Sequence, residues 1–231
     1  MSDFMVTGNV NPILKVAMAR GEKIYANASA MIAMDETIDL YGKMRHGFFR
    51  SWLRKKFGKT SFFQQEAHAK RGDGEIMFGH PSPGGMEVIS VGSRQYRLSD
   101  GVFLAAQDTV RLKVVAQGFF KGTLSGMGGM MILETDGHGD MAIASFGEIF
   151  TLDVREGKSV IVDQGHVMAW DRNLHYEIAV STQRSWIPMK GIIRTNMGGE
   201  FLLTRFKGNG TVYVASRNIR EFTKWMKQAN Q

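Results

Sequence analysis

Residues 21–35 read GEKIYANASAMIAMD and residues 157–171 read GKSVIVDQGHVMAWD, so glycine, an apolar strand, a turn and a second apolar strand occur in the same order in both. A more divergent copy occupies residues 96–105, which read YRLSDGVFLA. A second pattern, a glycine turn before an apolar strand, recurs at residues 128–134 and 198–204. A period of about 65 residues is typical of a repeated supersecondary unit. The shared order of the patterns therefore predicts three internal repeats.

The predicted repeats cover residues 6–85, 86–147 and 148–216, and a C-terminal helix follows in residues 217–231. We expect residues 1–231 to form a single compact unit, because 231 residues that are 43% hydrophobic can bury a large core. Glycines separate short runs rich in Val, Ile, Phe and Met, as hairpins and tight turns require. The predicted fold class is all-β. The alternative to true triplication is that any all-β chain places strands and turns at similar spacing.

The end of the chain departs from the strand pattern. Asn218 can cap a helix that runs from Ile219 to about Gln228. Its apolar residues fall at helical spacing and are Ile219, Phe222, Trp225 and Met226. We expect this apolar face to pack on the rest of the protein or on a neighbouring molecule.

Composition limits the compartment and the chemistry. No run of eighteen or more apolar residues occurs, so the sequence predicts no membrane-spanning helix. Residues 1–10 lack the basic and apolar regions of a secretory signal. The absence of cysteine excludes disulfides, thiolate catalysis and Cys-ligated zinc. We expect a cytoplasmic protein.

A basic insertion distinguishes the first repeat from the other two. Residues 41–60 hold seven Lys and Arg residues and no acidic residue, and this number equals the formal net charge of +7. Aromatic and apolar side chains in the same stretch fall at helical spacing, beside the basic face. The candidate partner surface consists of Phe48, Phe49, Arg50, Trp52, Arg54, Lys55 and Lys56.

This insertion has several interpretations. The plainest is that its aromatic residues cover an open end of the barrel while its charges are solvated. A basic amphipathic helix can also lie on an anionic membrane or bind an acidic protein, and these are the favoured partners. Nucleic-acid phosphates are a less favoured alternative.

A search for catalytic and ligand-binding motifs finds none that is complete. The six histidines never occur as His-x-His or His-Glu-x-x-His, which are metal-binding spacings. Leu152 stands where a phosphate-binding loop ending at Gly157 needs its first glycine, and Gly-x-Ser-x-Gly is absent. Asp35, Asp108 and Asp171 recur before turns, where we expect their side chains to bond the local backbone. We therefore predict no enzyme, no cofactor and no metal site.

The repeat residues also carry a resemblance. Residues 21–26, GEKIYA, residues 30–35, AMIAMD, residues 59–63, KTSFF, and residues 198–202, GGEFL, resemble the mitochondrial biogenesis (altered inheritance of mitochondria) family of uncharacterised proteins. The resemblance implies a fold related to the tryptophan RNA-binding attenuation protein, of double-stranded β-helix or β-sandwich type. It further implies a homotrimer that forms a pseudosymmetric ring. It transfers neither tryptophan nor RNA binding to particular residues here.

Two functions from different classes follow. The first is a non-enzymatic oligomeric scaffold or binding protein that works at a membrane surface or in assembly of a larger complex. The alternative is a ring that binds a small molecule or RNA at the seams between repeats.

Overall fold

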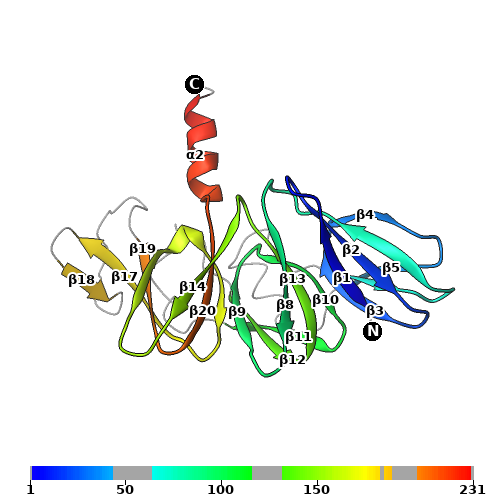
Figure 1. Ribbon diagram of the computed structural model, residues 1–231. Helices are drawn as coiled ribbons and strands as arrows, with labels where there is room; N and C mark the ends of the chain where they lie inside the picture. Colours follow the sequence, from blue (N-terminus) through cyan, green and yellow to red (C-terminus); the bar gives the residue numbers. More distant parts are fainter. Residues whose placement is uncertain (1, 44–63, 116–131, 183–184, 189–201, 230–231) are drawn as a thin grey trace, which may run out of the picture. The chain divides into compact units, whose positions relative to one another are not determined.

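The structure is a computed structural model that describes residues 2–43, 64–115, 132–182, 185–188 and 202–229 (Figure 1). These residues form mostly β-strands, with a short α-helix at the C-terminal end. The predicted all-β class with a C-terminal helix is therefore confirmed. The three-repeat division and the β-helix form stay predictions.

The chain divides into two compact units. The first contains residues 1–93, 101–113 and 135–145, and the second contains residues 94–100, 114–134 and 146–231. Both units therefore draw on residues that are far apart in the sequence.

The first unit contains two antiparallel sheets. In one, the strand order is β1 (Asp3–Thr7), β2 (Ile13–Met18), β7 (Gly74–Phe78) and β4 (Met31–Met34). In the other, it is β5 (Asp39–Lys43), β6 (Gln64–His68), β3 (Lys23–Asn27), β10 (Phe103–Gln107), β13 (Gly139–Ala144) and β8 (Met86–Val91). Leu14, Val16 and Phe78 of the first sheet share one buried core with Ile24 and Ala105 of the second. The two sheets thus pack face to face through their apolar sides.

The second unit is organised in the same way. One sheet has the order β11 (Val110–Val115), β12 (Ile132–Gly137), β9 (Tyr96–Ser99), β16 (Val167–Asp171), β20 (Gly210–Ala215) and β14 (Ile149–Val154). Its strands β9, β16, β20 and β14 lie wholly in the second unit, and β16, β20 and β14 supply one side of the core of that unit. The other sheet has the order β15 (Val160–Asp163), β19 (Leu202–Lys207), β17 (His175–Thr182) and β18 (Ser185–Pro188). A 3-10 helix, η1 (Gln164–His166), joins β15 to β16. Trp170 lies at the centre of this core, with its ring 5.7 Å from that of Phe206 and 5.2 Å from that of Tyr176.

Helix α2 (Ile219–Ala229) follows β20. The Asn218 side-chain oxygen accepts hydrogen bonds from the backbone N–H groups of Arg220 (3.0 Å) and Glu221 (3.4 Å), which confirms the predicted cap. No residue of the helix is buried, so its apolar face is at most partly covered by the described part of the chain, and packing on a neighbouring molecule stays a prediction. Phe222 touches the body, at 5.0 Å between its ring and that of Phe146.

One local arrangement occurs at three places. Strands β4, β10 and β16 each contain a register shift, between Met31 and Ala33, Phe103 and Ala105, and Val167 and Ala169. Their partners across the shift are β7, β13 and β20, which all begin at a turn glycine. A β-bulge of this kind bends its strand and sharpens the local twist. The three bulges occupy the positions that the sequence alignment makes equivalent.

A side chain at the end of each bulged strand holds the partner strand. The Asp35 carboxylate accepts a hydrogen bond from Glu75 N (2.8 Å), and the Asp171 carboxylate accepts one from Thr211 N (2.7 Å). In β10 the amide oxygen of Gln107 does the same for Asp140 N (3.0 Å). The expected role of Asp108 is therefore corrected, because this exposed residue lies one position too far along the chain. The bonded backbone group is also distant in sequence rather than local.

Each contact needs a glycine next to the bonded N–H. A Cβ added to Gly210 would lie 2.7 Å from Asp171 Oδ2 and 2.9 Å from Asp171 Cβ. At Gly74 it would lie 3.2 Å from Asp35 Cβ, and at Gly139 it would lie 3.3 Å from Gln107 Cβ. Real Cβ atoms do not approach other atoms below about 3 Å without displacing them. Gly210 is therefore required by close packing against Asp171. At the other two glycines the closest contacts of an added Cβ are also below this limit, with Thr37 Oγ1 (2.5 Å) at Gly74 and with Gln107 Oε1 (2.5 Å) at Gly139.

We expect Gln107→Ala to lower the free energy of unfolding by about 1–3 kcal/mol, because it leaves Asp140 N unpaired and removes a 2.8 Å hydrogen bond from Gln107 Nε2 to the backbone oxygen of Ser2. Asp108→Ala is the control, and should change stability by less than about 0.5 kcal/mol. Urea unfolding followed by circular dichroism measures both. Equal effects of the two substitutions would contradict the assignment of this role to Gln107.

We also expect Gly210→Ala to destabilise the protein by about 1–3 kcal/mol through overpacking against Asp171. The matched control is Gly42→Ala on β5, where an added Cβ meets nothing within 4 Å. Thermal unfolding of both variants should show a lower melting temperature for Gly210→Ala alone. A melting temperature unchanged from that of the unsubstituted protein would show that the turn can open to admit a methyl group.

Candidate functional site

Strand β4 is an open sheet edge where its equivalents are paired. Among the described strands, β4 pairs with β7 only and ends its sheet. The two other bulged strands have a second neighbour each, since β10 also pairs with β3 and β16 also pairs with β9. The outer side of β4 thus carries the backbone groups that bond a second strand in β10 and β16.

Strand β15 is also an open sheet edge, and the neighbour that it lacks is a bulged strand such as β4. The sequence alignment makes β15 equivalent to β3 and β9. Strand β3 pairs with β6 and β10, and β9 pairs with β12 and β16. In the part of the chain that the structure describes, β15 pairs with β19 alone. The neighbour that β15 lacks is a bulged strand, and the neighbour that β4 lacks is a strand of the β15 type.

The burial of these strands reflects whether they have a second neighbour. All five residues of β10 and all five of β16 are buried. Strand β4 is just as apolar, yet 54% of Ile32 and 38% of Met34 are exposed. On β15, 49% of Ile161 is exposed. Apolar, unpaired strands of this kind bind further strands or aggregate unless they are covered.

The predicted basic surface lies elsewhere in the chain. Phe48, Phe49, Arg50, Trp52, Arg54, Lys55 and Lys56 all fall within residues 44–63, outside the described residues, and their role stays a prediction. The structure describes the strands on either side, β5 and β6, which pair with each other.

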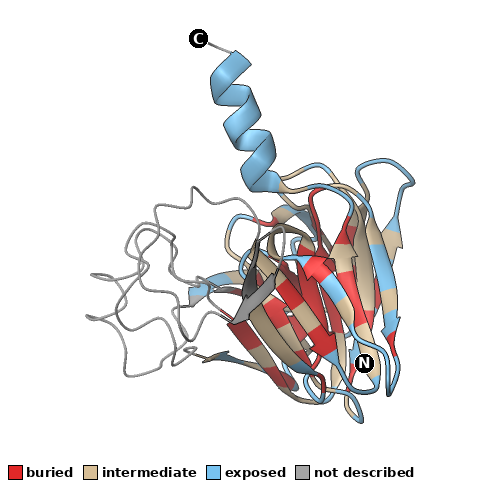
Figure 2. Cartoon of the chain, turned by 90° about the vertical axis from the view of Figure 1, so that its left-hand side faces the viewer, coloured by how far each residue is buried: buried red, intermediate tan, exposed pale blue. Residues whose placement is uncertain are grey.

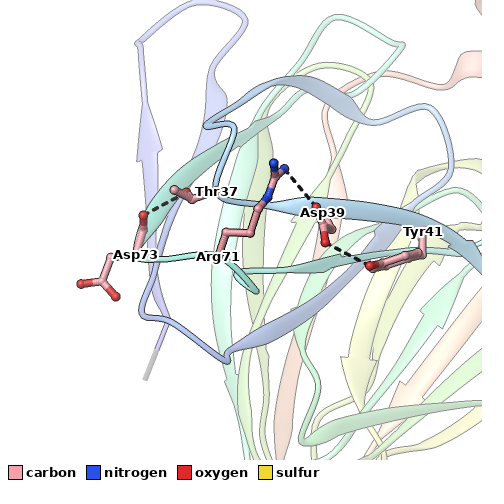
Figure 3. Close-up of polar contacts among 5 residues, drawn as sticks. All are labelled: Thr37, Asp39, Tyr41, Arg71 and Asp73. Carbon is pink, nitrogen blue, oxygen red and sulfur yellow. Dashed lines mark hydrogen bonds and ion pairs between the residues drawn. The ribbon is translucent and has the colours of Figure 1, made fainter.

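Polar contacts hold the strand that leads into this segment (Figure 3). Arg71 Nη2 donates to Asp39 Oδ1 at 3.0 Å, and the Tyr41 hydroxyl donates to Asp39 Oδ2 at 3.1 Å. The bond to the Asp39 carboxylate raises the pKa of the Tyr41 phenol. Thr37 Oγ1 donates to the backbone oxygen of Asp73 at 2.9 Å. These groups are exposed and satisfy one another, so they position β5 and offer no reactive group.

A shallow polar pocket in the second unit is the other candidate. It lies around Asp171 and is lined by Arg94, Asp153, Arg155, Asn173 and Asn209, among others. The Asp171 carboxylate is already engaged by Thr211 N, and the two arginines are matched by two aspartates. Among the described residues, no group of His, Asp and Glu side chains could hold a metal ion. The pocket has neither an activated group nor an excess charge that would select a ligand.

A membrane-spanning helix is not found either. No helix in the described part of the chain is long and apolar enough to cross a bilayer.

The similarity to known proteins extends over nearly the whole chain. An uncharacterised protein of Streptococcus pyogenes is 28% identical over 229 residues, which cover 94% of this chain and 86% of that protein. A crystal structure of a Streptococcus pyogenes protein has a TM-score of 0.78 and 26% identity, and the match covers 99% of this chain and 100% of that one. Residues 4–217 match the family model described as Mitochondrial biogenesis AIM24. The chain therefore belongs to the Mitochondrial biogenesis AIM24 family, which confirms the family that its residues resemble.

Proposed function

We propose that this protein is a non-enzymatic oligomeric scaffold or binding protein, assembled by pairing of β4 in one copy with β15 in the next. One observation carries the proposal. Among the described strands, one of each kind is left open, β4 and β15, and their equivalents pair with each other at two places within the chain. The open edges are therefore complementary to each other, and a second copy supplies both missing strands.

The internal pairings support a definite register. In both of them the partners are aligned in the same way, as Ala105↔Ala26, Ala106↔Tyr25 and Gln107↔Ile24, and as Ala169↔Leu98, Trp170↔Arg97 and Asp171↔Tyr96. Transferred to the open edges, this register pairs Ala33 with Val162, Met34 with Ile161 and Asp35 with Val160 of the next copy. The contact is antiparallel, as it is within the chain.

This register brings together exposed apolar side chains. Met34 and Ile161 are 38% and 49% exposed, and they fall opposite each other in the transferred alignment. Cross-strand apolar pairs of this kind stabilise a sheet by about 0.2–1 kcal/mol beyond the backbone hydrogen bonds. Pairing therefore covers two apolar side chains with each other and bonds two open edges at once.

The remaining edge strands do not support such a contact. Strands β8 and β14 are equivalent in the alignment, and both are sheet edges. Strands β5 and β11 are likewise both edges. Their equivalents β2 and β17 are covered by β1 and β18, which are neither bulged strands nor strands of the β3 type, so these edges do not lack the pairing that is missing at β4 and β15.

The contact is head to tail, because it joins two different strands. Such contacts close into rings or continue as filaments, depending on the rotation between copies. The homotrimer implied by the family resemblance is a closed form of this kind. We place the assembly in the cytoplasm, in agreement with a chain that has no cysteine.

We expect Met34→Lys and Ile161→Lys each to reduce the mass of the assembly, because an unpaired charge in the new sheet opposes its formation. Size-exclusion chromatography with light scattering measures the mass. The double variant Met34→Lys/Ile161→Glu faces opposite charges across each interface and should regain the mass of the unsubstituted protein.

The matched control is Phe150→Lys on β14, where 51% of the aromatic side chain is exposed. Its mass should be unchanged. A monomeric unsubstituted protein would refute the proposal, as would an unchanged mass in both single variants.

A further inference from the structure

Helix α2 presents an apolar face that stays largely exposed, although Phe222 contacts Phe146. Its large apolar side chains are exposed, with 47% for Ile219, 39% for Phe222, 59% for Trp225 and 42% for Met226. The ring of Trp225 lies 5.9 Å from that of Phe222 on the same helix. Figure 2 shows the helix exposed along its whole length. Exposure of four large apolar side chains to water along one stripe of a helix is energetically unfavourable.

The opposite face of the helix is cationic. At about 100° per residue, the four apolar side chains gather on one side of the helix, and Arg220, Lys224 and Lys227 gather on the other. Glu221 is the one acidic residue of α2, and its carboxylate lies 4.0 Å from Lys224 Nζ. Arg217 adds a further positive charge just before the helix. The segment therefore combines a strongly apolar face with a net positive polar face.

We propose that α2 is an interfacial helix that binds the surface of an anionic lipid bilayer. Helices that lie in a membrane interface have this pattern: a large separation of apolar and polar faces, low overall hydrophobicity, Lys and Arg on the polar face, and Trp or Phe on the other. Eleven residues span about 16 Å, roughly half the thickness of the hydrocarbon core, so the helix lies on the bilayer and does not cross it.

Charge and side-chain chemistry favour a lipid surface over a second copy of the helix. Helix α2 itself carries three basic residues and one acidic residue, so a negative bilayer attracts it, whereas the same helix of a second copy presents the same excess of positive charge. Lysine and arginine stems reach along the helix and bring their charges to the headgroups. Trp225, the most exposed of the four apolar residues, combines an apolar ring with a polar N–H, as interfacial aromatic residues do.

This inference is independent of the assembly proposed above, although assembly would strengthen it. Several α2 helices on one oligomer would contact one bilayer together, and each contact after the first is effectively intramolecular. A failure of membrane binding leaves the mass of the oligomer unchanged. A failure of assembly weakens membrane binding without abolishing the contribution of α2.

Co-sedimentation with vesicles tests the inference on the full chain. Vesicles of equal parts phosphatidylcholine and phosphatidylserine should carry the unsubstituted protein into the pellet, and vesicles of phosphatidylcholine alone should carry much less. The double variant Trp225→Ser/Met226→Ser should bind at least about tenfold more weakly, because it removes the most exposed apolar area of the helix. Phe150→Ser, which removes an exposed aromatic side chain from β14, is the matched control and should bind normally.

A charge variant tests the second element of the pattern. Arg220→Gln/Lys224→Gln/Lys227→Gln should weaken binding to the anionic vesicles by about tenfold or more, and added salt should weaken binding of the unsubstituted protein in the same direction. Melting temperatures and solution masses equal to those of the unsubstituted protein show that the variants fold and assemble normally.

The absence of cysteine permits a direct readout of depth. A polarity-sensitive dye attached to Met226→Cys should shift to the blue when anionic vesicles are added, whereas the same dye on Gln228→Cys, toward the polar side, should shift little. No sedimentation with anionic vesicles would overturn the inference. So would undiminished binding of Trp225→Ser/Met226→Ser, which would place the membrane contact elsewhere in the chain.

Discussion

The fold depends on the pairing of a bulged strand with a strand of the β3 type. Backbone N–H and C=O groups at a sheet edge must bond to protein or to water, and an apolar strand excludes water from its surroundings. Strands β10 and β16 meet this requirement inside the chain, where both are buried on all five residues. Strand β4 has the same bulge and the same apolar character, but no second neighbour within the part of the chain that the structure describes. The open edges at β4 and β15 thus each lack the type of neighbour that the other strand represents.

The bulge explains why the bulged strands can serve two neighbours. The extra residue turns the strand, so that its end reaches the turn glycine of the following strand. There the side chain of Asp35, Gln107 or Asp171 accepts a hydrogen bond from the N–H of the residue after that glycine. The glycine is needed because a Cβ would come within 3 Å of the accepting side chain at Gly139 and Gly210, and of Thr37 Oγ1 at Gly74. The register shift, the turn and the glycine therefore depend on one another, and a change in any of them disturbs the other two.

The sequence predicted the class and the local elements better than the contacts that join them. Alternating apolar residues and glycine turns have short-range signals, so the strands and the Asn218 cap could be found. Residue type predicts Asp108 as the counterpart of Asp35 and Asp171, whereas the position along the strand makes Gln107 the side chain that reaches the partner. No feature of the sequence indicates that Met34 is exposed. A strand with this composition looks the same whether its neighbour is present or absent.

The side chains at the open edges differ from their internal equivalents in an informative way. At the central position of the pairing, the internal contacts join Ala106 to Tyr25 and Trp170 to Arg97. Each combines a buried residue with one that carries a polar end, and Arg97 Nε donates to Glu134 Oε1 at 2.6 Å. In the proposed contact both residues, Met34 and Ile161, are apolar and of moderate size. Neither has a polar end to keep hydrated, so both side chains can be covered completely when the edges meet. Burial of both side chains on assembly therefore stabilises the contact between copies. This is the property expected of an interface between copies, and it would have no value in a strand that is always paired.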